Sequence, residues 1–134
     1  MEVPQDEVVC IDITVEDFNE LLTIQFSVNW DPTVLSFVRT ENYGIPISAG
    51  DFNTGQTGDG KLAFIWLDPL TNPRTVADGQ VLFSICFRGV GAPASSSTVR
   101  FSDDPTAQRA ENGVGDNVGI TANEAIVSIC LLYT

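Results

Sequence analysis

The sequence predicts an all-β domain, a jelly-roll β-sandwich of about nine strands. Apolar residues alternate with polar ones along most segments, and Gly, Pro and Asp cluster between these segments. No stretch has the apolar period and the capping residues of a helix. Alternation gives each strand one wet face and one dry face, and two sheets can share the dry faces as a core. The chain has no internal repeat or linker-like tract, so we expect one domain spanning residues 1–134.

The clearest strand pattern lies in residues 22–38. Its first half places five apolar residues on one phase, and these are Leu22, Ile24, Phe26, Val28 and Trp30. Asp31-Pro32 ends this strand, because proline has no N–H to donate and Asp favours a turn. Leu35 and Phe37 then restart the alternation. We expect this corner to let one segment supply a strand to each sheet.

The segments before this corner are shorter and more polar. Residues 1–7 predict a frayed lead-in, and Val8–Val15 alternates as a strand. Glu16–Glu20 predicts an acidic turn with Phe18 packed beneath it.

Several strands are expected after the corner. Lys61–Leu67 is nearly all apolar, so this strand can be covered on both faces or leave one apolar face exposed. In Gln80–Val90 the expected inward residues are Val81, Phe83, Ile85 and Phe87, and the expected outward residues are Leu82, Ser84, Cys86 and Arg88. The other expected elements are a short strand at 45–47 or 51–53, polar loops over 70–79 and 106–120, and strands at 98–102 and 125–132.

Charge and histidine content exclude several functions. The formal net charge is −12, so the surface repels phosphate backbones and anionic lipid, and we expect no nucleic-acid partner. No apolar run reaches the length of a membrane span, so we expect no membrane insertion. The chain has no histidine, which removes Ser-His-Asp and Cys-His catalysis and His-bearing zinc sites. The densest carboxylate cluster, Glu16, Asp17 and Glu20, crowds one turn, and we therefore expect no enzyme.

The three cysteines leave two alternatives open. Cys10, Cys86 and Cys130 lie in apolar strand-like runs without Cys-x-x-Cys spacing, which argues against a zinc site. They are either three buried thiols, or one disulfide with one thiol left over. The disulfide would place the protein outside the cytoplasm.

Aromatic residues and acidic loops give further candidates. Trp30 and Trp66 each precede an Asp-Pro stop or lie close to one, and they either anchor the core or, with Tyr43, stack on a glycan. Ala63, Ile65 and Leu67 form the second apolar phase of one strand. They mark an interface unless the loop 39–60 covers them.

Two acidic loops offer oxygen ligands for calcium. Asp51, Asn53 and Asp59 alternate in the way that calcium prefers, but their spacing does not match an EF-hand and equally suits a turn. A second set is Asp103, Asp104, Glu111 and Asp116. We expect no cofactor other than this candidate calcium.

The order of the motifs resembles the cohesin domain. The motifs are Val8-Val-Cys-Ile-Asp-Ile-Thr-Val15, the corner Trp30-Asp-Pro-Thr-Val-Leu35, Gly60-Lys-Leu-Ala-Phe-Ile-Trp66 and Asp78-Gly-Gln-Val-Leu-Phe83. The chain is similar to the broader cohesin-like superfamily that also contains carbohydrate-binding modules. It most resembles cohesin-type modules in large secreted proteins of Bacteroidetes-type bacteria.

This resemblance implies a nine-stranded jelly roll in which the first and last strands pair in parallel. It also implies that one flat sheet binds a calcium-loaded dockerin, with matching strands near 34–39, 61–67, 81–88 and 98–102. The outward candidates for the partner-binding sheet are Ser36, Val38, Ala63, Ile65, Leu67, Ser84, Arg88 and Arg100.

The expected function is therefore a non-catalytic module for protein–protein interaction, located outside the cell or on its surface. It would bind a dockerin-like partner or assemble with copies of itself, for example by exchanging a terminal strand into a filament. The alternative is a carbohydrate-binding module.

Overall fold

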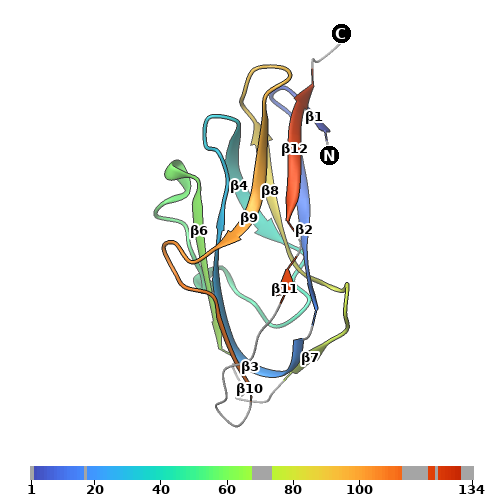
Figure 1. The fold of residues 1–134 in the computed structure, drawn as a ribbon, viewed down its shortest axis with the longest axis vertical. Helices are drawn as coiled ribbons and strands as arrows, with labels where there is room; N and C mark the ends of the chain where they lie inside the picture. The colour runs from blue at the N-terminus through green and yellow to red at the C-terminus, as the bar shows by residue number, and fades with distance from the viewer. Residues whose placement is uncertain (1, 17, 68–73, 113–120, 123, 131–134) are drawn as a thin grey trace.

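The computed structural model describes residues 2–16, 18–67, 74–112, 121–122 and 124–130, with backbone alone for 18, 19, 74, 121 and 122. This part of the chain forms two packed layers of strands (Figure 1), as the sequence predicts. The strands are β1 (Glu2–Pro4), β2 (Val8–Glu16), β3 (Phe18–Asn29), β4 (Leu35–Glu41), β5 (Phe52–Asn53), β6 (Lys61–Leu67), β7 (Arg74–Val76), β8 (Val81–Gly89), β9 (Ser96–Ser102), β10 (Arg109–Asn112), β11 (Thr121–Ala122) and β12 (Ala125–Cys130). Two single-turn 3₁₀ helices, η1 (Ala49–Asp51) and η2 (Thr57–Asp59), flank β5.

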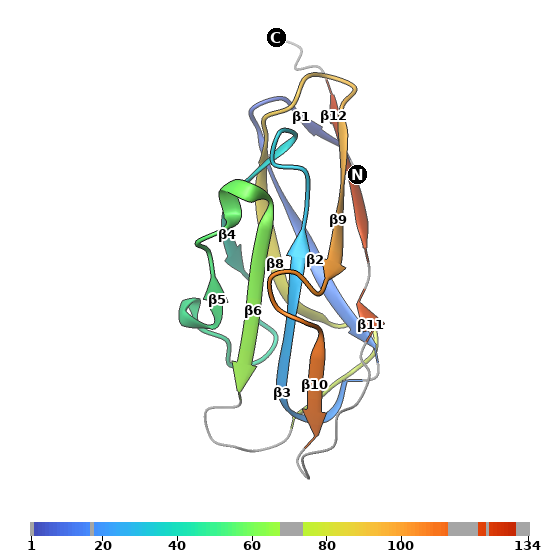
Figure 2. The ribbon, with the colours of Figure 1, turned by 60° about the vertical axis from the view of Figure 1, so that its left-hand side comes forward.

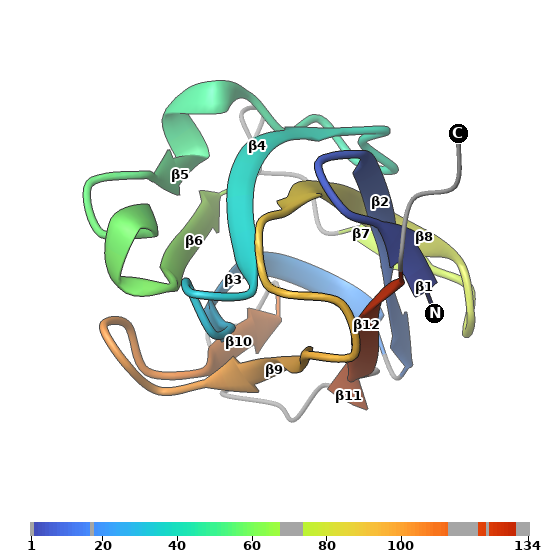
Figure 3. The ribbon, with the colours of Figure 1, turned by 90° about the horizontal axis from the view of Figure 1, so that it is seen from above.

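The strands form an eight-stranded sheet and a four-stranded sheet. The larger sheet has the order β1-β12-β9-β3-β6-β5, and β10 and β7 also pair with β3. The smaller sheet has the order β11-β2-β8-β4. Figure 2 shows β9 and β10 end to end on the same side of β3. Figure 3 shows the two layers viewed along the strands. Within the described residues, no helix is long and apolar enough to cross a membrane.

The core lies between the sheets and is rich in phenylalanine. Phe26, Phe64 and Phe83 are fully buried, and their ring centroids lie 5.0 to 6.1 Å apart. Phe52 of β5 joins them, with its ring centroid 5.0 Å from that of Phe64 and 5.0 Å from that of Phe83. Each such ring removes a large apolar area from water, so this cluster contributes strongly to holding the two layers together.

The corner after Trp30 moves the chain from one sheet to the other, as predicted. The Asp31 carbonyl accepts hydrogen bonds from the N–H groups of Val34 and Leu35, and β4 then begins in the smaller sheet. The Thr33 hydroxyl donates to the Asp31 carboxylate at 2.6 Å, and the Thr33 N–H donates to it at 2.9 Å. These two bonds favour the charged carboxylate and lower the pKa of Asp31. Gly60, at φ +77°, sits against the Trp30 carbonyl, where a side chain would collide.

The N-terminal residues are an ordered strand, which corrects the expected frayed lead-in. β1 pairs in parallel with β12, with Glu2 opposite Ser128 and Pro4 opposite Cys130. Val3 is 2% exposed, so this short strand is held by the core as well as by the ladder. The parallel pairing of the first and last strands is therefore confirmed.

Two β-bulges change the expected inward and outward phases. Leu21, not Leu22, is fully buried in β3, because the pairing register shifts beside Glu20, which has φ +51°. In β8 the register skips Leu82, which is buried together with Phe83, while Val81 is only half-buried.

The connections contain more strand than expected. β3 begins at Phe18, inside the expected acidic turn, and β7 and β10 lie in segments that looked like polar loops. β11 is a further short strand that pairs with β2. A short strand at 52–53 is confirmed as β5. Asp17, the Phe18 side chain, Asp116 and the last two residues of the expected 125–132 strand lie outside what the structure describes.

Candidate functional site

On the outer face of the eight-stranded sheet, β6 exposes two large apolar side chains. Ile65 is 54% exposed and Leu67 is 55% exposed, and both belong to β6. They lie opposite Gln25 and Thr23 of β3. Solvent-exposed aliphatic neighbours of this size on a flat sheet are typical of an interaction surface.

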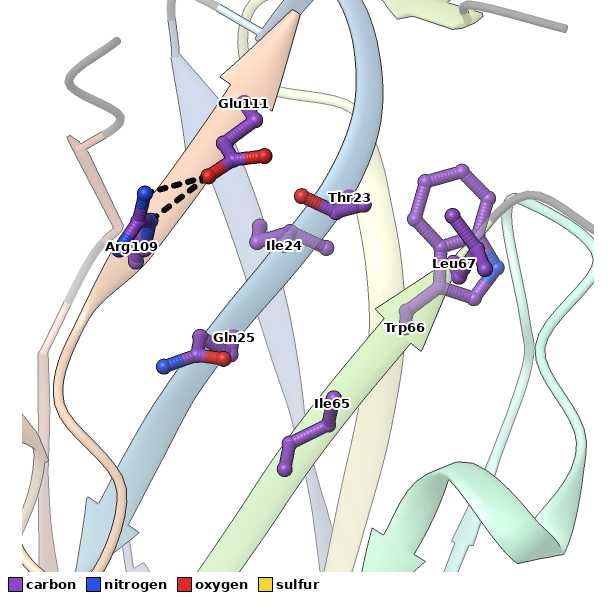
Figure 4. A pocket seen from close by; sticks show the side chains of 8 residues that line it. All are labelled: Thr23, Ile24, Gln25, Ile65, Trp66, Leu67, Arg109 and Glu111. Carbon is purple, nitrogen blue, oxygen red and sulfur yellow. Dashed lines mark hydrogen bonds and ion pairs between the residues drawn. The ribbon is translucent and has the colours of Figure 1, made fainter. Parts of the chain in front are cut away.

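These residues line a hollow of about 440 Å³ between β6, β3 and β10. Figure 4 shows Ile65 and Leu67 on one side, Thr23 and Gln25 on the floor, and the pair Arg109 and Glu111 on the other side. The register explains the arrangement, because Arg109 lies opposite Gln25 and Glu111 lies opposite Thr23. We call this surface, with its six residues just named, the β6 groove.

The strict alternation of β6 creates the open side of the groove. Leu62, Phe64 and Trp66 point into the core and are fully buried. The Trp66 Nε1–H donates to the Pro46 carbonyl at 3.2 Å, so the long loop before β5 packs against the inward side of β6. Ile65 and Leu67 therefore stay uncovered, and of the two alternatives that the sequence left open the structure contains the exposed one.

Hydrogen bonds fix the polar border of the groove. The Arg109 guanidinium contacts the Glu111 carboxylate at 2.6 Å, and the Gln25 amide donates to the Ala107 carbonyl at 3.0 Å. Ser27 is fully buried beneath the segment between β9 and β10 and exchanges two 2.8 Å hydrogen bonds with the Thr106 backbone. This border is part of the folded sheet before any partner arrives.

The eight residues predicted for one partner-binding sheet do not share a sheet, which is a correction. Ala63, Ile65, Leu67 and Arg100 lie in the eight-stranded sheet, whereas Ser36, Val38, Ser84 and Arg88 lie in the four-stranded sheet. The reason is the Asp31-Pro32 corner, which sends β4 to pair with β8 in the opposite layer. In addition, Ala63 is 3% exposed and Ser84 is 2% exposed, so neither presents much surface.

The outer face of the four-stranded sheet is mostly polar and is cross-linked, although Val8 and Val38 of this sheet are 38% and 37% exposed. Directly opposed residues of β2, β8 and β4 form three rows, which are Val8–Arg88–Ser36, Cys10–Cys86–Arg39 and Asp12–Ser84–Glu41. Cys10 and Cys86 form a disulfide, and Cys130 is free. The Ser84 hydroxyl donates to Asp12 at 2.6 Å, and Arg39 pairs with Glu41 at 3.2 Å. The disulfide alternative for the cysteines is the one that the structure contains.

The aromatic glycan candidates are mostly closed to solvent. Trp30 is 6% exposed and Trp66 is 0% exposed, so neither ring face is open to a sugar and both anchor the core. Tyr43 is 39% exposed, but its ring packs on Phe52 and its hydroxyl hydrogen-bonds with the Thr40 hydroxyl at 2.8 Å.

The calcium candidates use their oxygens within turns. The Asp51 carboxylate accepts from the Ser48 N–H at 2.8 Å, and the Asn53 side-chain oxygen accepts from the Gly55 N–H at 2.9 Å. Asp59 lies in η2. In the second set, Asp104 pairs with Lys61 at 2.6 Å and Asp103 accepts from the Gln108 N–H at 2.8 Å. Apart from the Asp104–Lys61 ion pair, these bonds are the turn chemistry that the residue types favour.

Comparison with known proteins decides the family. The family model described as the cohesin domain matches residues 1–127. The chain belongs to the cohesin family. This match confirms the resemblance to the cohesin domain that the sequence motifs indicated. Cohesins are non-enzymatic modules for protein–protein interaction. A search of the curated proteins found no match.

Solved cohesin structures share the fold over nearly the whole chain. One is the OlpA cohesin in complex with Doc918 from Clostridium thermocellum, with TM-score 0.77, 11% identity and coverage of 96% of this chain and 92% of that one. Another is the sixth scaffoldin B cohesin of Acetivibrio cellulolyticus in complex with a Cel5 dockerin, with TM-score 0.72, 20% identity and coverage of 98% and 93%. A third is the non-cellulosomal cohesin of the archaeon Archaeoglobus fulgidus, with TM-score 0.74, 16% identity and coverage of 96% and 84%.

Four residues of the groove were missed by the sequence reasoning. Thr23 and Gln25 occupy the polar phase of β3, so the alternation already marked them as outward. Arg109 and Glu111 belong to β10, whose single buried residue, Ala110, gave too weak an apolar pattern to reveal a strand.

Proposed function

We propose that this cohesin is a non-catalytic binding module that takes a dockerin-like protein module on the β6 groove. The single observation that supports this most is the exposure of Ile65 and Leu67, at 54% and 55%, beside an ordered polar border. An apolar centre within a polar rim is the usual anatomy of a protein interface.

The energetics of this surface suit reversible recognition. Covering a half-exposed aliphatic side chain contributes about 1 kcal/mol by its apolar area. Ile65 and Leu67 would therefore supply only part of the affinity, and hydrogen bonds from Gln25, Arg109 and Glu111 would add orientation. Because the border is fixed by contacts within the sheet, little conformational entropy is lost on binding.

A dockerin-like partner is the best-supported occupant. The solved OlpA and scaffoldin B cohesins are complexes with dockerins, and this chain shares their fold and family. With 11% and 20% identity to them, this chain would recognise its partner through its own groove residues. We also propose an extracellular or cell-surface location, which the Cys10–Cys86 disulfide supports.

The test is a titration of purified, calcium-loaded dockerin modules into the chain by isothermal titration calorimetry. We expect one dockerin to bind with 1:1 stoichiometry. Ile65→Asp combined with Leu67→Asp should weaken that binding by about a hundredfold or more, because two charges would be buried at the centre of the contact. The matched control is Val38→Asp on the four-stranded sheet, where Val38 is 37% exposed, and it should leave the affinity unchanged.

Two outcomes would contradict this function. One is that no dockerin binds, while sedimentation velocity shows concentration-dependent assembly of the chain alone, which would favour self-association. The other is that a soluble polysaccharide binds and changes tryptophan fluorescence, which would favour a carbohydrate-binding module.

A further inference from the structure

A second cluster of chemically active side chains lies on the outer face of the four-stranded sheet, away from the β6 groove. Cys10 of β2 and Cys86 of β8 lie directly opposite each other. The Glu41 carboxylate of β4 reaches over both of them, with its Oε1 atom 3.2 Å from the Cys10 Sγ and 2.9 Å from the Cys86 Sγ. The two Sγ atoms and the Glu41 carboxylate oxygen all lie within 4.8 Å of one another.

The contacts in this cluster join electron-rich atoms. Disulfide sulfurs carry no hydrogen, so neither sulfur can donate a hydrogen bond to the carboxylate. The positive charge next to the cluster is the Arg39 guanidinium, which lies 3.2 Å from the same Glu41 oxygen. The fold thus holds one carboxylate oxygen against a disulfide, and reduction of that disulfide would leave two thiols beside the same carboxylate.

We propose that Cys10, Cys86 and Glu41 bind one Zn²⁺ ion when the disulfide is reduced. A dithiol reductant supplies two electrons and two protons, which breaks the S–S bond and leaves two thiols while the reductant becomes a disulfide. Zn²⁺ then displaces one proton from each thiol and bonds to two thiolates and to the Glu41 carboxylate. Thiolates and carboxylates are both established zinc ligands.

Charge and spacing favour this ion. Two thiolates and one carboxylate carry three negative charges, which Zn²⁺ and the neighbouring Arg39 balance together. A tetrahedral site with Zn–S bonds of about 2.3 Å needs the two sulfurs roughly 3.8 Å apart. Directly opposed cysteines on adjacent strands can reach this separation by side-chain rotation, and Glu41 already stands against both. Solvent can supply a fourth ligand, because Cys10 and Glu41 are only half-buried.

The consequence is that residues of this cluster would cross-link strands of the four-stranded sheet in both redox states. In the oxidised chain a covalent bond joins β2 to β8. In the reduced chain the zinc ion would join β2, β8 and β4. The ligands are separated by 31 and 45 residues in the sequence, which is why a search for Cys-x-x-Cys spacing does not find them.

The experiment uses the Cys130→Ser variant, so that the two cysteines under test are the only ones present. The reduced, metal-free protein is titrated with Zn²⁺ by calorimetry and with Co²⁺ by absorption spectroscopy. We expect one ion per reduced chain, thiolate-to-cobalt charge-transfer bands, and a higher melting temperature with zinc. The oxidised protein should show none of these. Glu41→Gln should weaken zinc binding at least about tenfold while the cobalt–thiolate bands remain.

Two results would overturn the proposal. One is the absence of stoichiometric zinc binding in a reduced chain that circular dichroism shows to be folded. The other is zinc binding that survives unchanged in Cys10→Ser combined with Cys86→Ser, which would place the ion elsewhere.

Discussion

The two outer faces of this sandwich arise from the same alternating pattern but have opposite properties. On the eight-stranded sheet, β6 turns Ile65 and Leu67 toward solvent. On the four-stranded sheet, β8 turns Ser84, Cys86 and Arg88 outward. Ser84 and Cys86 bond to β2, and Arg88 donates to the Asp6 carbonyl in the turn between β1 and β2. One face therefore leaves the apolar side chains of β6 exposed to solvent, whereas the other uses most of its outward side chains for bonds within the domain.

This contrast fits the proposal that recognition and reinforcement lie on opposite faces of the jelly roll. The disulfide lies on the sheet opposite the β6 groove, so a change to one should leave the other intact. Four variants probe the two faces and the corner between them, in order of the size of the effect that we expect.

Removal of the disulfide should have the largest effect on stability and none on recognition. Cys10→Ala combined with Cys86→Ala opens a link between residues 76 positions apart, and loss of a loop constraint of this length costs about 4 kcal/mol. Urea unfolding of the variant and the parent protein measures this difference. Dockerin affinity at a temperature where the variant is folded should be unchanged, and a weakened affinity would show that the two faces are coupled.

Loss of the Ser27 hydroxyl should weaken both stability and recognition. Ser27→Ala removes two hydrogen bonds and leaves the Thr106 N–H and carbonyl unpaired, which costs about 2 kcal/mol in unfolding free energy. The segment that positions Arg109 is then less well held, so dockerin affinity should also fall. Ser36→Ala on the other face is the control, and it should change neither the unfolding free energy nor the dockerin affinity. Equal effects of Ser27→Ala and Ser36→Ala would show that the Ser27–Thr106 bonds do not specifically support the groove.

Breaking the Arg109–Glu111 pair should affect recognition more than stability. Both side chains are partly exposed, at 57% and 29%, and such surface pairs contribute about 0–1 kcal/mol to folding. Arg109→Ala should therefore unfold at nearly the same urea concentration as the parent protein and bind dockerin more weakly. A loss of stability without a loss of affinity would place this pair outside the contact.

The smallest effect should be at the corner that joins the two faces. Hydrogen bonds from the Thr33 hydroxyl and N–H lower the pKa of Asp31, so Asp31 stabilises the fold at pH values above its ordinary pKa. This contribution is lost as the pH falls through the lowered value. Thr33→Val removes the hydroxyl bond, and the Asp31 pKa measured by NMR should rise toward its ordinary value. An unchanged pKa would show that the backbone bond alone is responsible.

The sequence predicted the architecture well because alternation is a local property. The phases of Ile24, Phe26 and Val28 follow from period-two spacing alone, and the Asp31-Pro32 stop marks the change of sheet. The outward position of Ile65 and Leu67 was one of two alternatives, and it depended on where the preceding loop packs.

Long-range features could not be predicted in the same way. Alternation gives the phase of a strand but not the sheet to which it belongs, so β4 and β8 were grouped with β6. Bulges at Leu21 and Leu82 move the phase by one residue without a clear sequence signal. The approach of Glu41 to the two cysteines depends on the order β2-β8-β4, which only the folded chain specifies.

The central claim is that the eight-stranded sheet recognises the partner and the four-stranded sheet does not. Its most direct test is a map of backbone amide chemical shifts by NMR as saturating dockerin is added. Changes concentrated on β3, β6 and β10, with β2, β4 and β8 unmoved, are the expected result. Changes concentrated on β4 and β8 would assign recognition to the cross-linked face and contradict the account.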